Sequence, residues 1–224
     1  MRKAQLGIMA VAAGFAVAPS AMAAIDLQIT ETWTGLSGED GTQDWIEVTN
    51  FGDTIADTGN YWYDDSSPTI GSGGNLDSFS LGQGESAVFL FDSLPVDDVT
   101  FTTAVEEFEA IWGSITNLGH TNGGGGLGQG GDSANLMLGD GTIIDTLDYA
   151  GSGDLQTFEN LSNTVQLSVS GVNGAYESAP FFNDNLGLPS DTAILVGSPG
   201  AVPEPATIAM LLSGAICVMS RRRR

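Results

Sequence analysis

The sequence predicts an all-β fold: a β-sandwich with one short helix, flanked by a signal peptide and a C-terminal transmembrane helix. Three observations lead to this prediction. Short apolar and polar alternations of strand length recur through residues 25–200. Turn signals rich in glycine, asparagine and aspartate separate them. The two ends of the chain have the composition of targeting segments rather than of a folded domain.

The N-terminal segment, residues 1–23, has the three parts of a signal peptide. Arg2 and Lys3 are followed by an apolar run over 6–18 and then by Ala21-Met22-Ala23. The apolar run would be roughly 20 Å long as a helix, which is short for a membrane span. We therefore expect cleavage at the Ala21 and Ala23 site, so that the mature protein begins at Ala24.

The body between the targeting segments is strongly acidic. All six basic residues lie at the ends of the chain, and all but one of the 28 acids, Glu204, lie between Asp26 and Asp191. A surface of this sign repels phosphate, which excludes nucleic acid as a partner and favours divalent cations. The one cysteine, Cys217, lies outside the body, so the body has no disulfide and depends on its core.

The strands follow from the alternation. They are predicted over 25–32, 45–50, 60–63, 78–81, 87–91, 135–138, 143–149 and 164–169. In the second of these, Ile46 and Val48 face the core and Glu47 faces solvent. Gly139-Asp140-Gly141 predicts a hairpin between two of the strands. A helix is predicted over 103–112, and the region 171–200 gives no clear pattern.

Four blocks in order resemble the lamin-tail domain family. They are I-T-E at 29–31, D-W-I-E-V-T-N-F-G-D at 44–53 followed by D-T-G at 57–59, L-G-Q-G-E at 81–85, and G-D-S-A-N-L-M-L at 131–138 running into G-T-I-I-D-T-L-D-Y at 141–149. The resemblance implies an immunoglobulin-like sandwich over 24–200 that serves binding or cell-surface architecture and has no catalytic residues. The glycine-rich loop 122–131 and the absence of basic residues depart from the family pattern.

The C-terminal segment, residues 202–224, has three parts of its own. Val202-Pro203-Glu204-Pro205 precedes an apolar helix predicted over 206–220, and Arg221, Arg222, Arg223 and Arg224 close the chain as a membrane-stop cluster. This order resembles the PEP-CTERM sorting signal. The resemblance implies an inner-membrane intermediate, cleavage by an exosortase-type membrane protease, and transfer to the surface or extracellular matrix of a Gram-negative bacterium. A plain C-terminal membrane anchor is the alternative.

Calcium is the metal that the acidic turns favour, because it prefers hard oxygen ligands. The candidate ligands lie in or beside predicted turns: Asp40, Asp44, Asp64, Asp65, Asp97 and Asp98. None of these segments has the twelve-residue spacing of an EF-hand loop. A calcium-dependent surface-binding module is therefore one alternative function.

An exported polysaccharide hydrolase is the other alternative. Glycosidic cleavage uses paired carboxylates, for which Asp44 with Glu47 and Glu106 with Glu109 are candidates. A serine hydrolase would need Ser133 beside His120, the one histidine. The glycine run 123–131 lacks the lysine of a phosphate-binding loop, so we expect a flexible surface loop there.

The function predicted from the sequence is that of a noncatalytic exported cell-surface or matrix protein. It would be processed by an exosortase, cross the inner membrane transiently through its C-terminal helix, and contribute to adhesion or biofilm organisation. Exopolysaccharide or other surface proteins are the expected binding partners.

Overall fold

The computed structural model describes residues 24–35, 43–70, 73–95, 100–161, 164–182 and 192–201. The signal peptide with Ala21 and Ala23, the calcium candidates Asp40, Asp97 and Asp98, and the tail 202–224 lie outside these residues. The described part is mostly β-sheet with one short α-helix, which confirms the all-β prediction. The immunoglobulin-like connectivity remains a prediction.

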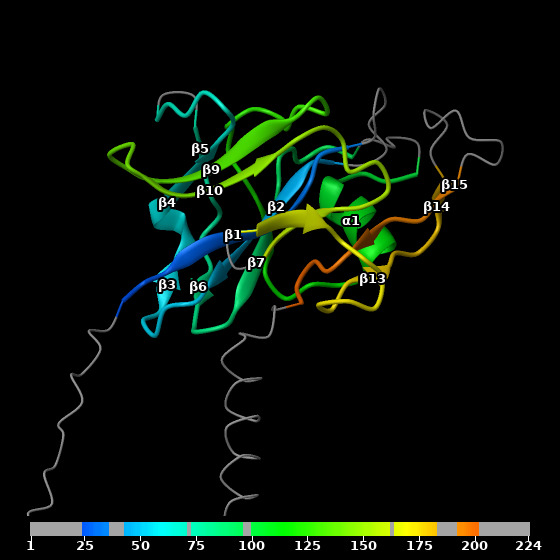
Figure 1. Cartoon of the computed structure of the whole chain (residues 1–224), viewed down its shortest axis with the longest axis horizontal. Helices are drawn as coiled ribbons and strands as arrows, with labels where there is room; N and C mark the ends of the chain where they lie inside the picture. The colour runs from blue at the N-terminus through cyan, green and yellow to red at the C-terminus, as the bar shows by residue number, and fades with distance from the viewer. Residues whose placement is uncertain are drawn as a thin grey trace, which may run out of the picture.

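Two sheets form the body (Figure 1). The larger has the order β12(Thr164–Leu167), β11(Phe158–Leu161), β1(Leu27–Trp33), β2(Trp45–Asn50), β7(Ser86–Leu90) and β8(Leu118–His120). The smaller has the order β10(Ile143–Tyr149), β9(Asp132–Leu138), β4(Tyr61–Asp64) and β5(Gly74–Asn75). All these pairs are antiparallel except β7 with β8, which is parallel.

The remaining elements are small. Three two-stranded ladders join β3(Ala56–Asp57) to β6(Ser80–Leu81), β13(Tyr176–Glu177) to β16(Val196–Gly197), and β14(Phe181–Phe182) to β15(Thr192–Ala193). A 3-10 turn, η1(Thr58–Asn60), precedes β4. The helix is α1(Ala104–Trp112), within one residue of its predicted range.

The first core lies between the two sheets. Ile29, Ile46 and Phe89 from the larger sheet pack in one cluster with Leu136 and Leu147 from the smaller one. These five side chains are fully buried. The prediction that Ile46 and Val48 face the core is confirmed, since both have no exposed surface.

A second core covers the opposite face of the larger sheet. Trp45 packs edge-on against Phe108 and Trp112 of α1, with ring centroids 5.9 and 6.1 Å apart. Leu195 from the C-terminal part of the body belongs to the same cluster. Figure 1 shows α1 and the segment around β13 and β14 together beside the larger sheet. Both faces of β2 are therefore buried, and the prediction that Glu47 faces solvent is wrong.

The local signals for the hairpin and the helix act as the sequence predicts. The hairpin closes through a bond from the Gly141 amide to the Leu138 carbonyl, 2.9 Å, with Gly141 at φ 87°. The helix begins after Thr103, whose hydroxyl accepts from the Glu106 amide at 3.2 Å. It ends at Gly113, which has φ 86°.

Candidate functional site

A row of three glutamates crosses the larger sheet on the face away from the first core. Glu31 of β1 pairs in register with Glu47 of β2 and with Glu159 of β11. Their side chains are 1, 1 and 3 % exposed. Buried carboxylates are rare unless a cation or several hydrogen-bond donors accompany them. Because residues 24–201 contain no lysine or arginine, this glutamate row depends on hydrogen bonds.

A β-bulge places Glu31 in the row. Ile29 pairs with Val48 and Glu31 pairs with Glu47, so Thr30 is an extra residue in β1. Strict alternation would put Ile29 and Glu31 on the same face. The bulge sends Ile29 into the first core and Glu31 to the other side of the sheet. The Thr30 hydroxyl donates to Glu47 Oε1 at 2.7 Å.

The C-terminal end of the body covers the glutamate row and supplies donors to it. The Ser198 amide donates to Glu31 Oε1 at 2.7 Å, and the Ser198 hydroxyl donates to Glu31 Oε2 at 2.9 Å. The Gly200 amide donates to Glu47 Oε2 at 2.6 Å. Thr157 donates a further hydroxyl to Glu31. The carboxyl groups of Glu31 and Glu47, on β1 and β2, therefore accept hydrogen bonds from residues more than 100 positions away in the sequence.

Glu159 is the least satisfied member of the row. Its Oε2 accepts a weak bond from Asn173 at 3.4 Å, and its buried Oε1 has no hydrogen-bond partner. A carboxylate oxygen left in this state carries a desolvation cost.

Burial dominates the electrostatics of the row. It raises the pKa of Glu31 to about 7, against the lowering effect of the bonds from Thr157 and Ser198. Burial, and next the neighbouring Glu31, raise the pKa of Glu47 to about 8. The Tyr176 pKa rises to about 12 through burial and then through the negative charges of Glu31 and Glu47. Glu31 and Glu47 therefore retain protons at a pH where free carboxyl groups have lost them.

The carboxylates of the catalytic pairs considered from the sequence take part in hydrogen bonds within the chain. Asp44 accepts from the Leu127 amide at 2.9 Å, whereas Glu47 belongs to the buried row. Glu106 and Glu109 both lie exposed on α1. Glu106 accepts from Thr102 at the start of the helix, and Glu109 accepts from Ser114 at its end.

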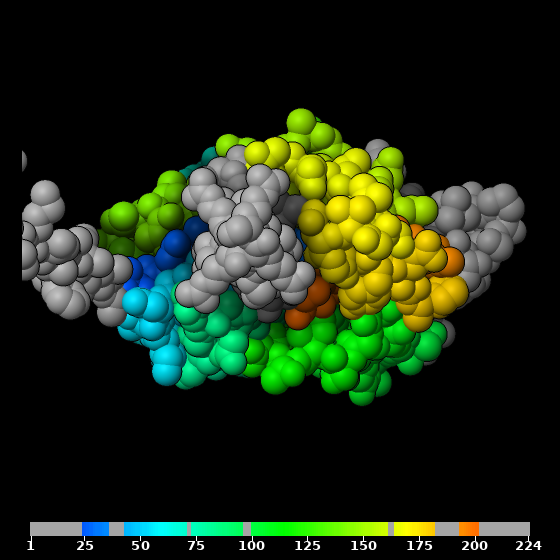
Figure 2. All heavy atoms as spheres, turned by 60° about the horizontal axis from the view of Figure 1, so that its bottom comes forward, coloured from blue at the N-terminus to red at the C-terminus, as the bar shows by residue number. Residues whose placement is uncertain are grey.

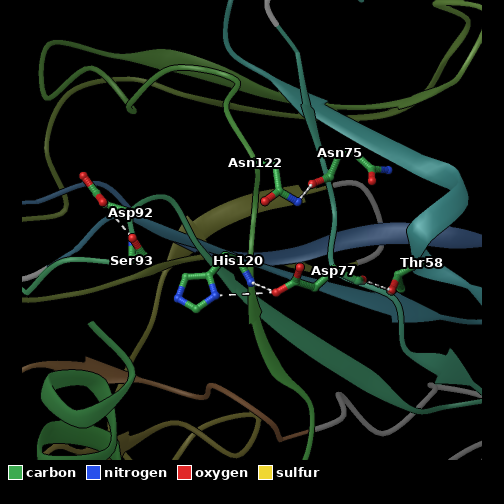
Figure 3. A network of polar contacts seen from close by, with 7 residues as sticks. All are labelled: Thr58, Asn75, Asp77, Asp92, Ser93, His120 and Asn122. Carbon is green, nitrogen blue, oxygen red and sulfur yellow. Dashed lines mark hydrogen bonds and ion pairs between the residues drawn. The ribbon is translucent and has the colours of Figure 1, made fainter. Parts of the chain in front are cut away.

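The serine hydrolase arrangement is also not formed. Ser133 donates to Asp148 across the hairpin between β9 and β10. His120 contacts Asp77 instead: Asp77 Oδ2 accepts from the His120 amide at 2.8 Å and lies 3.5 Å from Nδ1 (Figure 3). The carbonyl of Asp77 accepts from Thr58 at 2.6 Å, so this network holds strands together.

The described calcium candidates close turns. Asp64 accepts from the amides of Asp65 and Thr69, and Asp65 accepts from the amide and hydroxyl of Ser67 at 3.0 Å. Asp44 and Asp64 are each oriented by backbone amides, those of Leu127 and Thr69. Within the described ranges, no group of three or more histidine, cysteine, aspartate or glutamate side chains has an arrangement that could hold a metal ion.

The glycine-rich loop 122–131 is packed rather than free. Its Leu127 is 5 % exposed and joins the first core. The Gly128 amide donates to Asp132 at 2.9 Å, and the Gly128 carbonyl accepts from the Tyr149 hydroxyl at 3.0 Å. A side chain at Gly124 would lie 2.6 Å from Tyr63. Most residues of the loop are exposed, as expected for a surface loop, and its glycines allow close approach to aspartates and aromatic rings.

Comparison with known proteins identifies the end of the chain. Residues 201–224 match the PEP-CTERM protein-sorting motif. The chain carries a PEP-CTERM sorting signal. This motif indicates an exported surface protein that exosortase, a membrane protease, recognises and processes. No curated protein and no solved structure matches the chain, and no family match supports the lamin-tail interpretation of the body. Among the described residues, no helix is long and apolar enough to cross a membrane.

Proposed function

We propose that the chain is a noncatalytic surface or matrix protein whose acidic β-body is exported, freed from its C-terminal tail by exosortase, and displayed in a Gram-negative envelope or polysaccharide matrix. The observation that carries the proposal is the position of the sorting motif. It begins at residue 201, directly after Ser198 and Gly200 complete the body. Nothing between the body and the motif forms a separate domain.

The contacts of the acidic residues support a binding or structural role over hydrolysis. A glycosidase needs two carboxyl groups open to a sugar. Glu31 and Glu47 lie side by side, but Ser198 and Gly200 cover them. The depression beside Gln43 and α1 encloses about 180 Å³ together with open solvent, below the usual size of a ligand pocket.

The exposed acids supply the interaction surface in this proposal. An acidic body without lysine or arginine attracts divalent cations, which can bridge it to anionic polysaccharide. An immunoglobulin-like connectivity and a lamin-tail relationship are compatible with such a role and are part of the proposal. Adhesion and biofilm organisation are its expected physiological outcomes.

Expression in an exopolysaccharide-producing host with and without its exosortase tests the proposal. We expect a surface-extracted protein without residues 221–224 in the complete host, and a membrane-retained protein with an intact tail in the deficient one. A Glu204→Ala variant should resemble the deficient host, and Glu177→Gln, an exposed change in the body, should not. An intact arginine cluster on the surface-extracted protein would favour a plain anchor.

Turnover assays separate the hydrolase alternative. The purified protein should release no sugar from the host's matrix glycans on a zymogram, while it co-sediments with those glycans in calcium. Release of sugar that is lost in Glu47→Gln or Glu106→Gln would overturn the noncatalytic proposal.

A further inference from the structure

The residues that cover the glutamate row are also the residues that lead to the sorting motif. Val196 and Gly197 form β16, Ser198 and Gly200 donate to Glu31 and Glu47, and the motif match begins at residue 201. We call residues 196–201 the latch. Figure 2 shows these residues, in orange, emerging between the yellow segment that includes 164–182 and the green segment that includes α1.

The latch limits the reach of the sorting motif. Gly200 and Glu204 are four positions apart in the sequence, and an extended chain of that length spans at most about 14 Å. If residues 197–200 leave the body, the free segment begins at Val196 and spans at most about 27 Å. With the latch closed, the sorting motif stays next to the folded body, which limits the access of a membrane protease to it.

The latch fits its place tightly. The Val196 amide donates to the Leu155 carbonyl at 2.8 Å, and the Thr157 amide donates to the Val196 carbonyl at 2.9 Å. A side chain at Gly197 would lie 2.9 Å from Glu31 Oε1 and 2.9 Å from the Trp112 ring. Closure therefore depends on glycine at position 197 and on both carboxyl groups beneath it.

The titratable groups that face the latch are all acids. Glu31, Glu47 and Glu159 come from three neighbouring strands, and Tyr176 comes from β13, which pairs with β16 of the latch. Glu107 lies elsewhere, beside Gln43, and His120 contacts Asp77. Residues 24–201 hold no lysine or arginine to offset a second negative charge in the row.

A chain of hydroxyl groups connects the row with the edge of the buried region. Glu47 Oε1 accepts from Thr30, whose hydroxyl lies 2.8 Å from that of Thr49. The Thr49 hydroxyl lies 2.8 Å from that of Ser86, which is half-buried. Hydroxyl groups both donate and accept, so this chain gives the proton on Glu47 a path while the latch is closed.

We propose that residues 196–201 are a proton-controlled latch, closed while Glu31 and Glu47 keep their protons and opened as these protons leave. The latch would set the distance at which the sorting motif is presented to exosortase. Opening admits water, where a glutamic acid releases its proton near pH 4.3. Opening therefore releases protons and becomes easier as pH rises. The part that concerns exosortase rests on the proposed function.

Hydrogen exchange tests the latch itself. The full chain, isolated in detergent from a host without exosortase, is exchanged between pH 5 and pH 7, and rates for a peptide covering 195–201 are divided by their intrinsic values. Each proton released on opening gives a rise of about tenfold per pH unit. The wild type should therefore exceed a tenfold rise, because Glu31 and Glu47 both release protons, and Glu47→Gln, which keeps Glu31, should fall to about tenfold or less. The exposed, matched change Glu177→Gln should keep the wild-type rise. A flat wild-type profile, or equal slopes in the two variants, would overturn the latch.

A second variant pair covers the case in which Glu47→Gln does not fold. Gly197→Ala should open the latch already at pH 5, and Gly130→Ala, where an added methyl group has open space, should not. Far-UV circular dichroism shows whether each variant keeps its sheets. Exchange of 195–201 that stays slow in folded Gly197→Ala would contradict the tight fit on which the latch depends.

Pulse–chase processing in the complete host tests the link to exosortase. Loss of the tail should be several-fold faster at external pH 8 than at pH 6 in the wild type, and the difference should be smaller in Glu47→Gln, which keeps only Glu31. If the rate of tail loss does not depend on pH although hydrogen exchange of 195–201 does, the link between latch and exosortase is refuted and the proposed function is unaffected. If the tail is not removed at all, the proposed function is refuted, and the latch is still judged by hydrogen exchange alone.

Discussion

Replacing Glu47 by glutamine should stabilise the protein at pH 8 and leave it nearly unchanged at pH 5. The folded state holds the Glu47 pKa near 8, whereas the unfolded chain has the ordinary value of 4.5. Between these two pH values the native state therefore binds more protons than the unfolded chain. The contribution of Glu47 to the free energy of unfolding is fully present below pH 4.5 and is lost as pH rises through 8. Each unit of pKa difference corresponds to about 1.4 kcal/mol, so the loss is on the order of several kcal/mol. Glutamine has no such proton to lose.

Urea unfolding followed by tryptophan fluorescence measures this prediction at pH 5.5 and pH 8 in about 0.5 M sodium chloride. Salt of this strength screens the exposed acids. Glu177→Gln removes an exposed carboxylate at the edge of the same region and is the matched control. If Glu47→Gln gains no more stability at pH 8 than Glu177→Gln does, the buried row is not the source of the pH dependence.

Three further predictions concern the core, the surface charge and the ends of the chain. Ile46→Asp should unfold the body, since an unpaired carboxylate in the first core costs several kcal/mol, and a melting temperature within a few degrees of wild type would contradict the assigned register. The melting temperature should rise with sodium chloride, because salt screens the repulsion between the acids. Calcium at matched ionic strength should add little, because Asp44, Asp64 and Asp65 already accept from backbone amides. A clear extra rise of the melting temperature in calcium would instead indicate a specific site. Intact mass of the surface protein should show a chain that begins at Ala24 and lacks 208–224, and a retained signal peptide would refute the predicted cleavage after Ala23.

The first core was predictable because it follows from one strand period. Ile46 and Val48 alternate with polar residues, and both lie between the sheets. The period says which residues share a face, but it does not say whether the other face is covered. The cover comes from α1 and from the described residues 176–182 and 192–200, which have no clear sequence pattern, and it changes Glu47 from an expected exposed residue into a buried one.

The glutamate row could not have been predicted from spacing. The bulge at Thr30 shifts Glu31 by one residue, and no turn or proline marks it in the sequence. Glu159 lies in β11, a strand that the sequence prediction omits. The anchoring of the loop 122–131 was unpredictable for a related reason, since the partner Asp44 is 83 positions from Leu127. Among the calcium candidates that the structure describes, the oxygen atoms of Asp44, Asp64 and Asp65 accept from amides of the chain itself.

The bonds between Ser198 and Glu31 join residues 167 positions apart, and this separation sets the order of events during export. A chain that crosses the membrane from its N-terminus delivers β1 first and the donors of Glu31 last. Long-range pairing of this kind is slow to form and leaves the early strands incomplete in the meantime. The glutamates of β1 and β2 remain open to water until residue 200 has crossed. Folding of the body is therefore completed only as the sorting tail arrives, so completion of the fold and readiness for processing coincide in time.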